Sequence, residues 1–131
     1  MDVSKIDEEI AHDEDSVAIP INKKNGDPYV GANGEDATIS VTGVDAKKYK
    51  KVRDRIQKKN LNRSGKMETA ELMKNRVDLA VAGSTGWSGW EANGASWEFN
   101  DENLRTLISK EHILEQVERG IKNHADFFAK S

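Results

Sequence analysis

Histidine spacing decides first whether this chain could bind a metal ion or use an imidazole in catalysis. His112 and His124 are twelve residues apart on the last expected helix, so their side chains point roughly 120° apart around its axis. His12 is distant in sequence from both. No two histidines have the i, i+4 spacing that places two zinc ligands on one helix face, and the chain contains no cysteine. The sequence therefore predicts no metal site.

A short glycine motif, Gly83-Ser84-Thr85-Gly86, invites comparison with loops that hold phosphate. It follows an expected helix rather than a strand, and it lacks the Gly-Lys-Ser/Thr ending of nucleotide-binding loops. No basic residue flanks it, as the Gly-x-x-Gly clamp of a single-strand RNA module would require. The chain also has no Gly-x-Ser-x-Gly motif to mark a nucleophilic serine. We interpret these glycines as turn residues and expect a protein without a cofactor that is not an enzyme.

Positive charge is concentrated between residues 47 and 66, where ten lysines and arginines accompany a single acid, Asp54. Such a cluster can bind nucleic acid by releasing counterions from the phosphates. The net charge of −3 opposes this interpretation, and the one aromatic residue in the cluster, Tyr49, belongs to an apolar stripe. A protein partner, or the chain's own acidic N-terminus, fits the cluster better. The candidate partner-binding residues here are Lys47, Lys51 and Arg55.

All three tryptophans lie in the glycine-rich segment 83–99, at Trp87, Trp90 and Trp97. Exposed aromatic side chains can form a ligand platform, whereas buried ones form a corner of the core beneath a loop. Trp97 and Phe99 alternate toward one face, as residues of an extended chain do. We favour the core interpretation, and we expect an aromatic loop with a hairpin-like turn at Asn93-Gly94.

The N-terminal third contains an acidic segment followed by strand signals. Residues 1–16 hold seven acids against one lysine and few large apolar side chains, so we expect residues 1–15 to form an acidic disordered tail. The β-branched runs 17–21 and 38–42 predict strands, and the Asn-Gly pairs between them predict tight turns. We therefore expect a β hairpin or a three-stranded meander, with Pro20 at an edge or a strand end.

Two helices are expected next in the chain. Asp45 can cap a helix over 46–59, whose apolar stripe is narrow and whose remaining surface is basic. A second helix over 68–81 should end at Gly83. Helices joined by so short a connection usually pack antiparallel.

Two further helices complete the chain. Asn100 is a suitable N-cap for a helix that runs to about Ser109. The final helix, over 110–130, has the strongest amphipathic pattern in the sequence. One stripe on it consists of Ile113, Val117, Ile121 and Phe128, which leaves Leu114 and Phe127 with no obvious burial site. Because surplus apolar width can capture another helix, we expect this helix to bind a partner or to self-associate through Leu114, Phe127 and Phe128 as well as to pack on the core. The alternative is a helix buried on two sides of a compact monomer.

Length and composition limit the organisation of the whole chain. Its 131 residues suit one domain, which we place at 16–131. The predicted fold class is α+β, with a small N-terminal β hairpin or meander followed by a mainly helical body of about four helices. No apolar run approaches the roughly 20 residues of a membrane span, and the first residues are acidic rather than basic. We therefore expect a cytoplasmic protein with no membrane partner.

Short motifs in residues 70–128 carry a family resemblance. The segment 81–90 reads VAGSTGWSGW, the segment 97–104 reads WEFNDENL, and the last helix ends in two phenylalanines. This combination resembles the tail assembly chaperones of lambda-like long-tailed bacteriophages, the siphophages. The residues that match the family's pattern, which are expected to form the fold rather than an interface, are Trp87, Gly89, Trp97, Phe99, Glu102, Asn103 and Leu104.

The resemblance implies a non-catalytic, mainly helical protein that binds the tape measure protein and helps to recruit tail tube subunits. It further implies that the protein works in the cytoplasm of the bacterial host and is absent from the mature virion. Two alternatives stay open. One is a nucleic-acid-binding regulator that uses the basic helix 47–66, and the other is a structural component of the phage head or tail.

Overall fold

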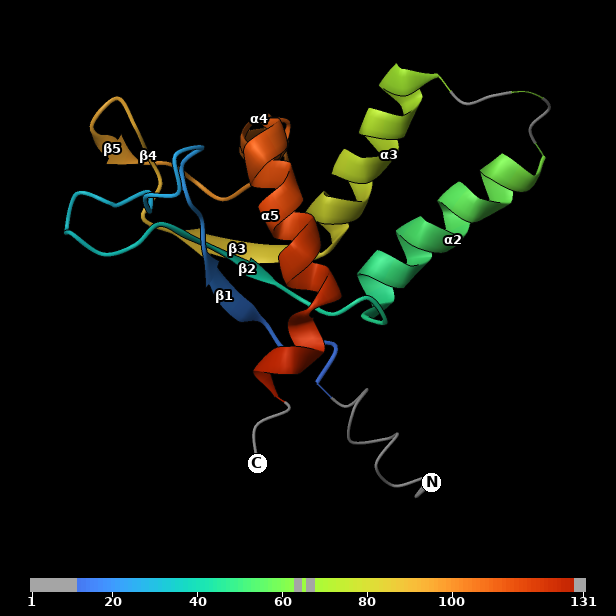
Figure 1. Cartoon of the computed structure of the whole chain (residues 1–131), viewed down its shortest axis with the longest axis horizontal. Helices are drawn as coiled ribbons and strands as arrows, with labels where there is room; N and C mark the ends of the chain where they lie inside the picture. Colours follow the sequence, from blue (N-terminus) through green and yellow to red (C-terminus); the bar gives the residue numbers. More distant parts are fainter. Residues whose placement is uncertain (1–11, 63–64, 66–67, 129–131) are drawn as a thin grey trace.

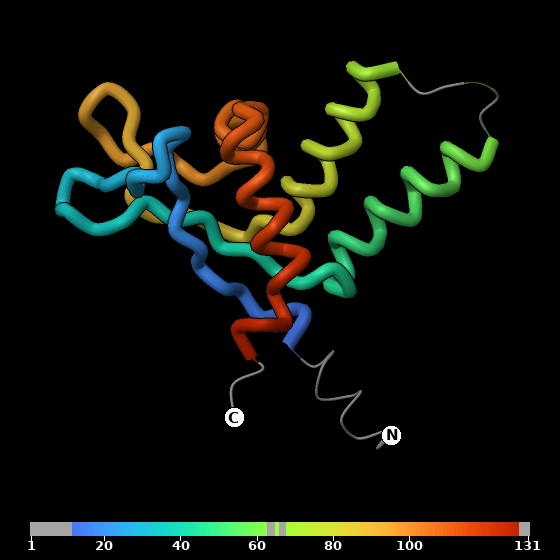
Figure 2. Tube along the Cα trace, viewed as in Figure 1, coloured from blue at the N-terminus to red at the C-terminus, as the bar shows by residue number. Residues whose placement is uncertain are grey.

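The computed structural model describes residues 12–62, Gly65 and residues 68–128. A three-stranded antiparallel sheet, in the order β1-β2-β3, packs against the C-terminal helices α4 and α5, while α2 and α3 extend to one side of the molecule (Figures 1 and 2). The predicted α+β class is confirmed: in the described residues, a small antiparallel meander combines with four α-helices.

Two strands of the sheet were predicted from the sequence, and the third was not. Strands β1 (Val17–Pro20) and β2 (Thr38–Val41) pair in the register that sets Ile19 opposite Ile39. Strand β3 (Ser84–Ser88) pairs with the other edge of β2, so the interpretation of the glycine motif as a turn was wrong. This segment has no β-branched alternation of its own, and its strand conformation depends on hydrogen bonds to β2.

The connection between β1 and β2 doubles back twice. Isolated bridges join Asn22 to Pro28 and Val30 to Asp36, and both Asn-Gly turns have the positive φ that the sequence predicted, +94° at Gly26 and +82° at Gly34. Pro20 is the last residue of β1, which is an edge strand, as expected for a residue that cannot donate to a ladder.

The helical arm is the name we give to α2 (Lys47–Leu61) together with α3 (Thr69–Ala82). The helix α3 ends at Gly83, as predicted. The prediction that Asp45 caps α2 was wrong, because the N-cap position belongs to Ala46, which provides no side-chain hydrogen bond. The backbone N–H of Lys47 instead donates to the carboxylate of Glu14, a residue of the expected tail.

A two-stranded hairpin and two helices follow β3. The strands β4 (Glu91–Ala92) and β5 (Ala95–Ser96) enclose the predicted Asn-Gly turn. The helix α4 (Asp101–Ile108) begins as predicted, with the side chain of Asn100 accepting a hydrogen bond from the Asn103 backbone N–H at 2.8 Å. The capping signal in the sequence was therefore sufficient to locate this helix.

The last helix is shorter than predicted. The helix α5 (Glu111–Lys122) ends near the middle of the expected range 110–130, and a 3₁₀ turn, η1 (His124–Phe127), follows it. The turn directs His124 inward, where its side chain is buried and its Nε2 lies 2.6 Å from the carbonyl oxygen of Asp15. This long-range contact explains why α5 ends at Lys122. No local sequence pattern predicts it.

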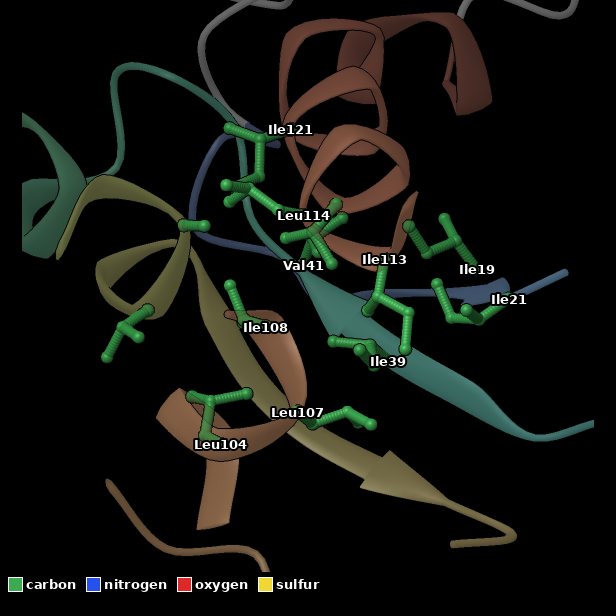
Figure 3. Packing of buried hydrophobic residues seen from close by; sticks show 13 residues of the cluster. Ile19, Ile21, Ile39, Val41, Leu104, Leu107, Ile108, Ile113, Leu114 and Ile121 are labelled. Carbon is green, nitrogen blue, oxygen red and sulfur yellow. The ribbon is translucent and has the colours of Figure 1, made fainter. Parts of the chain in front are cut away.

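The core lies between the sheet and α5, with α3 and α4 closing its other sides. Figure 3 shows the buried side chains of β2 gathered with those of α4 and α5. Gly120 lets α5 approach the sheet closely, because a Cβ atom there would lie 2.5 Å from Cδ1 of Ile19. Fully buried members include Ile21, Ile39, Val41, Ile108, Ile113, Leu114 and Val117.

The first described residues pack on the domain beside η1 (Figure 2). The backbone N–H of Gly43 donates to the carbonyl oxygen of Asp13, and the ring of His12 stacks on Phe128 with centroids 4.3 Å apart. Residues 12–15 of the segment expected to be a tail are thus held by specific contacts, whereas residues 1–11 lie outside the described residues.

Candidate partner-binding groove

The helical arm forms a groove along its length. We call this hollow, of about 590 Å³, the arm groove, and α2, α3 and α4 all contribute to its walls. The lining residues are Lys48, Val52, Arg55, Ile56 and Lys59 of α2, Lys74, Asn75, Asp78, Val81 and Ala82 of α3, and Asp101 and Arg105 of α4. The arm groove therefore lies where three helices meet.

The arm groove combines an apolar floor with a cationic rim. Val52 and Ile56 of α2 are half-buried beside the buried Val81 of α3. Five cations and two acids lie among the lining residues, so the groove carries a net positive charge. An amphipathic helix with acidic residues beside its apolar face would satisfy both parts of this surface.

One of the two acids anchors the arm to the body. Asp78 is only 8% exposed, and it accepts a hydrogen bond from Nη1 of Arg105 at 2.7 Å. Arg55 approaches its other carboxylate oxygen at 3.5 Å. The hydrogen bond to Asp78 is the main cause that raises the pKa of Arg105, and Asp101 adds a second bond at 2.9 Å. Two of the groove cations are therefore tied to this carboxylate, while Lys48 and Lys74 pair with no other described residue.

The predicted basic contacts separate into two groups. Arg55 lines the arm groove, but Lys47 and Lys51 lie outside it on exposed α2 surface. An α-helix turns 100° per residue, which places Lys51 and Lys58 on nearly the same outward line and Lys48, Arg55 and Lys59 on the groove side. The structure thus divides a cluster that is continuous in the sequence into a groove face and an outer face.

The predicted apolar contacts at the C-terminus also separate. Leu114 is fully buried, because α5 packs against α3, α4 and β2 at once, so it was wrong to leave this residue without a burial site. Phe127 is 48% exposed, in agreement with the expectation that it lacks a core position. Phe128 is 37% exposed, and its ring lies between His12 and His124, with centroid distances of 4.3 and 5.1 Å. These residues form no continuous apolar face.

The tryptophans form the corner that the sequence favoured. Trp87 stacks on Trp97 with centroids 5.2 Å apart and meets Phe99 edge-on at 5.3 Å. The indole N–H of Trp87 donates to the Trp97 carbonyl oxygen, and that of Trp90 donates to Thr38. Because both indole groups are satisfied and the rings pack on the core cluster, this corner holds the loop onto the sheet.

The other residues of the family motif also have structural positions. Gly89 has a φ of +85°, and a Cβ atom there would lie 2.9 Å from Cα of Ala37. The side chain of Asn103 donates to the carbonyl oxygen of Glu98, and Leu104 is buried. The Glu102 side chain is exposed, and its backbone carbonyl accepts a hydrogen bond from Thr106. The motif residues therefore do not line the arm groove.

Two exposed leucines on the arm were not predicted as binding residues from the sequence. Leu61 at the end of α2 is 86% exposed, and Leu72 near the start of α3 is 49% exposed. Leu61 is the last residue of α2 and Leu72 lies in the first turn of α3, at the end of the arm far from the sheet. The signal available in the sequence was Leu61 itself, an apolar residue at the end of an otherwise polar and basic helix.

Other kinds of site have less support in the described part of the chain. In residues 12–62, 65 and 68–128, no three histidine, cysteine or acidic side chains are placed to hold a metal ion. Within the same residues, no helix combines the length and apolar character needed to cross a membrane. No protein-family model, curated protein or solved structure matches this chain.

Proposed function

We propose that this protein is a non-catalytic tail assembly chaperone of a long-tailed bacteriophage, which binds the tape measure protein in the arm groove and helps to recruit tail tube subunits. Two kinds of support meet in this proposal. The motifs in residues 70–128 resemble that family of chaperones, and the helical arm provides a surface suited to an elongated helical partner.

The observation that carries the proposal is that α2 is a helix of 15 residues without a single buried residue. Helices in proteins gain most of their stability from packing an amphipathic face, because isolated helices of about 12–15 residues are marginal in water. Here Val52 and Ile56 of α2 remain only half-buried, and Leu61 at its end is exposed. A second helix in the arm groove would complete the burial of Val52 and Ile56, which is how helix-in-groove recognition obtains its affinity.

Charge reversal inside and outside the groove tests this proposal. The groove variant is Lys48→Glu with Lys74→Glu, and the control is Lys51→Glu with Lys58→Glu, which makes the same change in net charge on the outer face of α2. Each full-length chain would be co-expressed with the tape measure protein of the same phage, and the affinity would be measured after purification.

We expect the groove variant to lose at least about tenfold in affinity while the control stays within about twofold, since charge complementarity acts over roughly one Debye length. Equal affinity of both variants would contradict a role for the groove. Recovery of the chain from purified virions would replace the chaperone with a structural tail component.

Nucleic-acid binding is the second candidate, and one observation favours it. Five lysines of α2 make no ion pair with another described residue: Lys47, Lys48, Lys50, Lys51 and Lys58. A fluorescent DNA duplex titrated with the protein at about 0.15 M salt separates the candidates, because phosphate binding weakens steeply as salt rises. Submicromolar affinity with a steep salt dependence, abolished in the Lys51→Glu and Lys58→Glu variant, would favour the nucleic-acid function.

A further inference from the structure

The cations that line the arm groove differ in how firmly the protein holds them. Arg105 is bound by Asp78 at 2.7 Å and by Asp101 at 2.9 Å. Lys59 contacts the carboxylate of Glu71 at 3.4 Å. The other three groove cations, all with exposed side chains, are Lys48, Arg55 and Lys74. A partner's carboxylates can therefore approach these three without breaking a short ion pair of the arm.

Arg55 can turn away from Asp78 without leaving that carboxylate unpaired. The Arg55 side chain is 66% exposed, and its contact with Asp78 is 3.5 Å long. Asp78 would keep the 2.7 Å hydrogen bond that Nη1 of Arg105 donates to it. A guanidinium binds a carboxylate best through two parallel hydrogen bonds. A partner's acid can offer Arg55 that geometry, so Arg55 is suited to bind one.

The groove side of α2 repeats with the spacing of a coiled coil. Lys48 and Arg55 are seven residues apart, which places them about 20° apart around the helix and about 10.5 Å apart along it. Val52 and Ile56 lie beside them at the i, i+4 spacing of one apolar stripe. A helix packed along this side would cover the apolar stripe with its own and place its flanking residues at the two cations, as in a coiled coil.

Lys74 places a cation on the opposite wall of the arm groove. The helices α2 and α3 run in opposite directions along the arm (Figure 1), and the contact between Arg55 and Asp78 fixes their register. Lys74 is four residues from Asp78, or about 6 Å toward the far end of the arm. The apolar floor is thus bounded by cations on both sides, so a complementary helix carries acids on both flanks of its apolar stripe.

We propose that the arm groove selects a helix by the spacing of its acids. Two carboxylates seven residues apart on one flank of the helix pair with Lys48 and Arg55, and a third on the other flank pairs with Lys74. Arg55 is the residue that distinguishes this arrangement from other acidic helices. The assignment of the helix to the tape measure protein rests on the proposed function, whereas the selectivity follows from the groove itself.

Two synthetic peptides test the selectivity without the tape measure protein. Each has about 20 residues, because helices shorter than about 12–15 residues are marginal in water, and each carries the same stripe of leucines. The matched peptide has three glutamates at the proposed flanking positions and three glutamines on the opposite face. The shifted peptide exchanges the glutamates with the glutamines, so the two peptides have the same composition and net charge.

Fluorescence anisotropy with the full-length protein would measure both affinities at about 0.15 M salt, where the Debye length is about 8 Å. We expect the matched peptide to bind at least about tenfold more tightly, since complementary charges at an interface fix the register of the partners. Equal affinity of the two peptides would overturn the proposal, and so would the failure of both to bind.

Variants of the protein identify the residues responsible. Arg55→Gln removes the charge and should weaken the matched peptide about fivefold to tenfold while leaving the shifted peptide unchanged. Arg55→Lys keeps the charge without the planar fork and should fall between Arg55→Gln and the native chain. Lys51→Gln, on the outer face of α2, is the matched control and should change both affinities by less than about twofold.

A second variant guards against a change in the fold. Lys48→Gln alters an exposed side chain that pairs with no other described residue, so thermal unfolding should be unchanged while the matched peptide weakens. If Arg55→Gln and Lys48→Gln weaken both peptides equally, the groove responds to charge without regard to spacing, and the selectivity is wrong.

The selectivity and the proposed function fail in different experiments. A matched peptide that binds as expected, together with a tape measure protein indifferent to Lys48→Glu and Lys74→Glu, would leave the selectivity intact and contradict the proposed partner. A tape measure protein that depends on the groove, together with two peptides of equal affinity, would leave the proposed function intact and remove the selectivity.

Discussion

The side-chain carboxylate of Glu14 accepts a hydrogen bond from the backbone N–H of Lys47, the first residue of α2, across 33 positions of the chain. The helix has no acid in its own first turn and no side-chain cap of its own. Glu14 therefore satisfies an N–H group that would otherwise lack a protein partner, and it places negative charge at the positive end of the helix dipole.

Replacing Glu14 by Ala should lower the free energy of unfolding by about 1 kcal/mol, the usual cost of removing an N-terminal cap. Urea unfolding followed by circular dichroism would measure it. Deletion of residues 1–11 is the matched control, because it leaves Glu14 in place, and it should change the urea midpoint little. Equal stability of Glu14→Ala and the native chain would show that water replaces this bond without loss.

Truncation of Leu114 should destabilise the protein much more than truncation of Phe127. Leu114 is fully buried, so Leu114→Ala should destabilise the protein by about 2–5 kcal/mol through lost burial and a cavity. Phe127 is 48% exposed, so Phe127→Ala should cost less than about 1 kcal/mol. Thermal unfolding of both variants decides the point, and a large loss for Phe127→Ala would mean that its ring belongs to the core.

The aromatic corner offers a second test of core packing. Trp87 contacts both Trp97 and Phe99 and donates one hydrogen bond, so Trp87→Ala should destabilise by about 3–5 kcal/mol. Trp87→Phe retains much of the apolar area and should recover about half of that loss. Denaturant unfolding of the two variants measures this difference, and an unchanged midpoint for Trp87→Ala would move the corner from core to ligand platform.

The buried carboxylate of Asp78 makes Arg105 important for the arm. Arg105→Ala should destabilise the protein by about 2 kcal/mol, because it leaves a buried charge with only the longer contact to Arg55. Adding Asp78→Asn to that variant removes the charge and should restore part of the stability. If the double variant is no more stable than Arg105→Ala, the loss comes from the packing of the arginine stem rather than from the charge.

The raised pKa of Asp13 should make the stability of the protein depend on pH. Burial, and then repulsion from Asp45, raise the pKa of Asp13 above its ordinary value of 3.8. A folded-state pKa that exceeds the unfolded one favours the folded protein below the unfolded value, and this contribution is lost as the pH rises through the folded-state pKa. Asp13→Asn should therefore raise the thermal midpoint at pH 7 relative to the native chain and change it little at pH 3. A lower midpoint at pH 7 would contradict the role of the charge.

Local chemistry was enough to identify several elements of this protein. Asn100 marks the start of α4 because its side chain can accept from a free N–H of the first turn, and the Asn-Gly pairs mark turns because glycine tolerates positive φ. The alternating run 38–42 identified β2 since a strand buried on one face needs alternate apolar residues. These signals act within a few residues and can be read without the rest of the fold.

Other features depend on contacts between distant residues, which only the tertiary structure decided. The segment Ser84–Ser88 is a strand because β2 offers an unpaired edge, and α5 ends early because His124 turns inward toward Asp15. The basic cluster is divided into a groove face and an outer face by the position of α3, so of the three cations singled out in the sequence only Arg55 lines the arm groove. The residue types predicted a basic surface, and the packing of α2 against α3 determined which of its side chains line the arm groove.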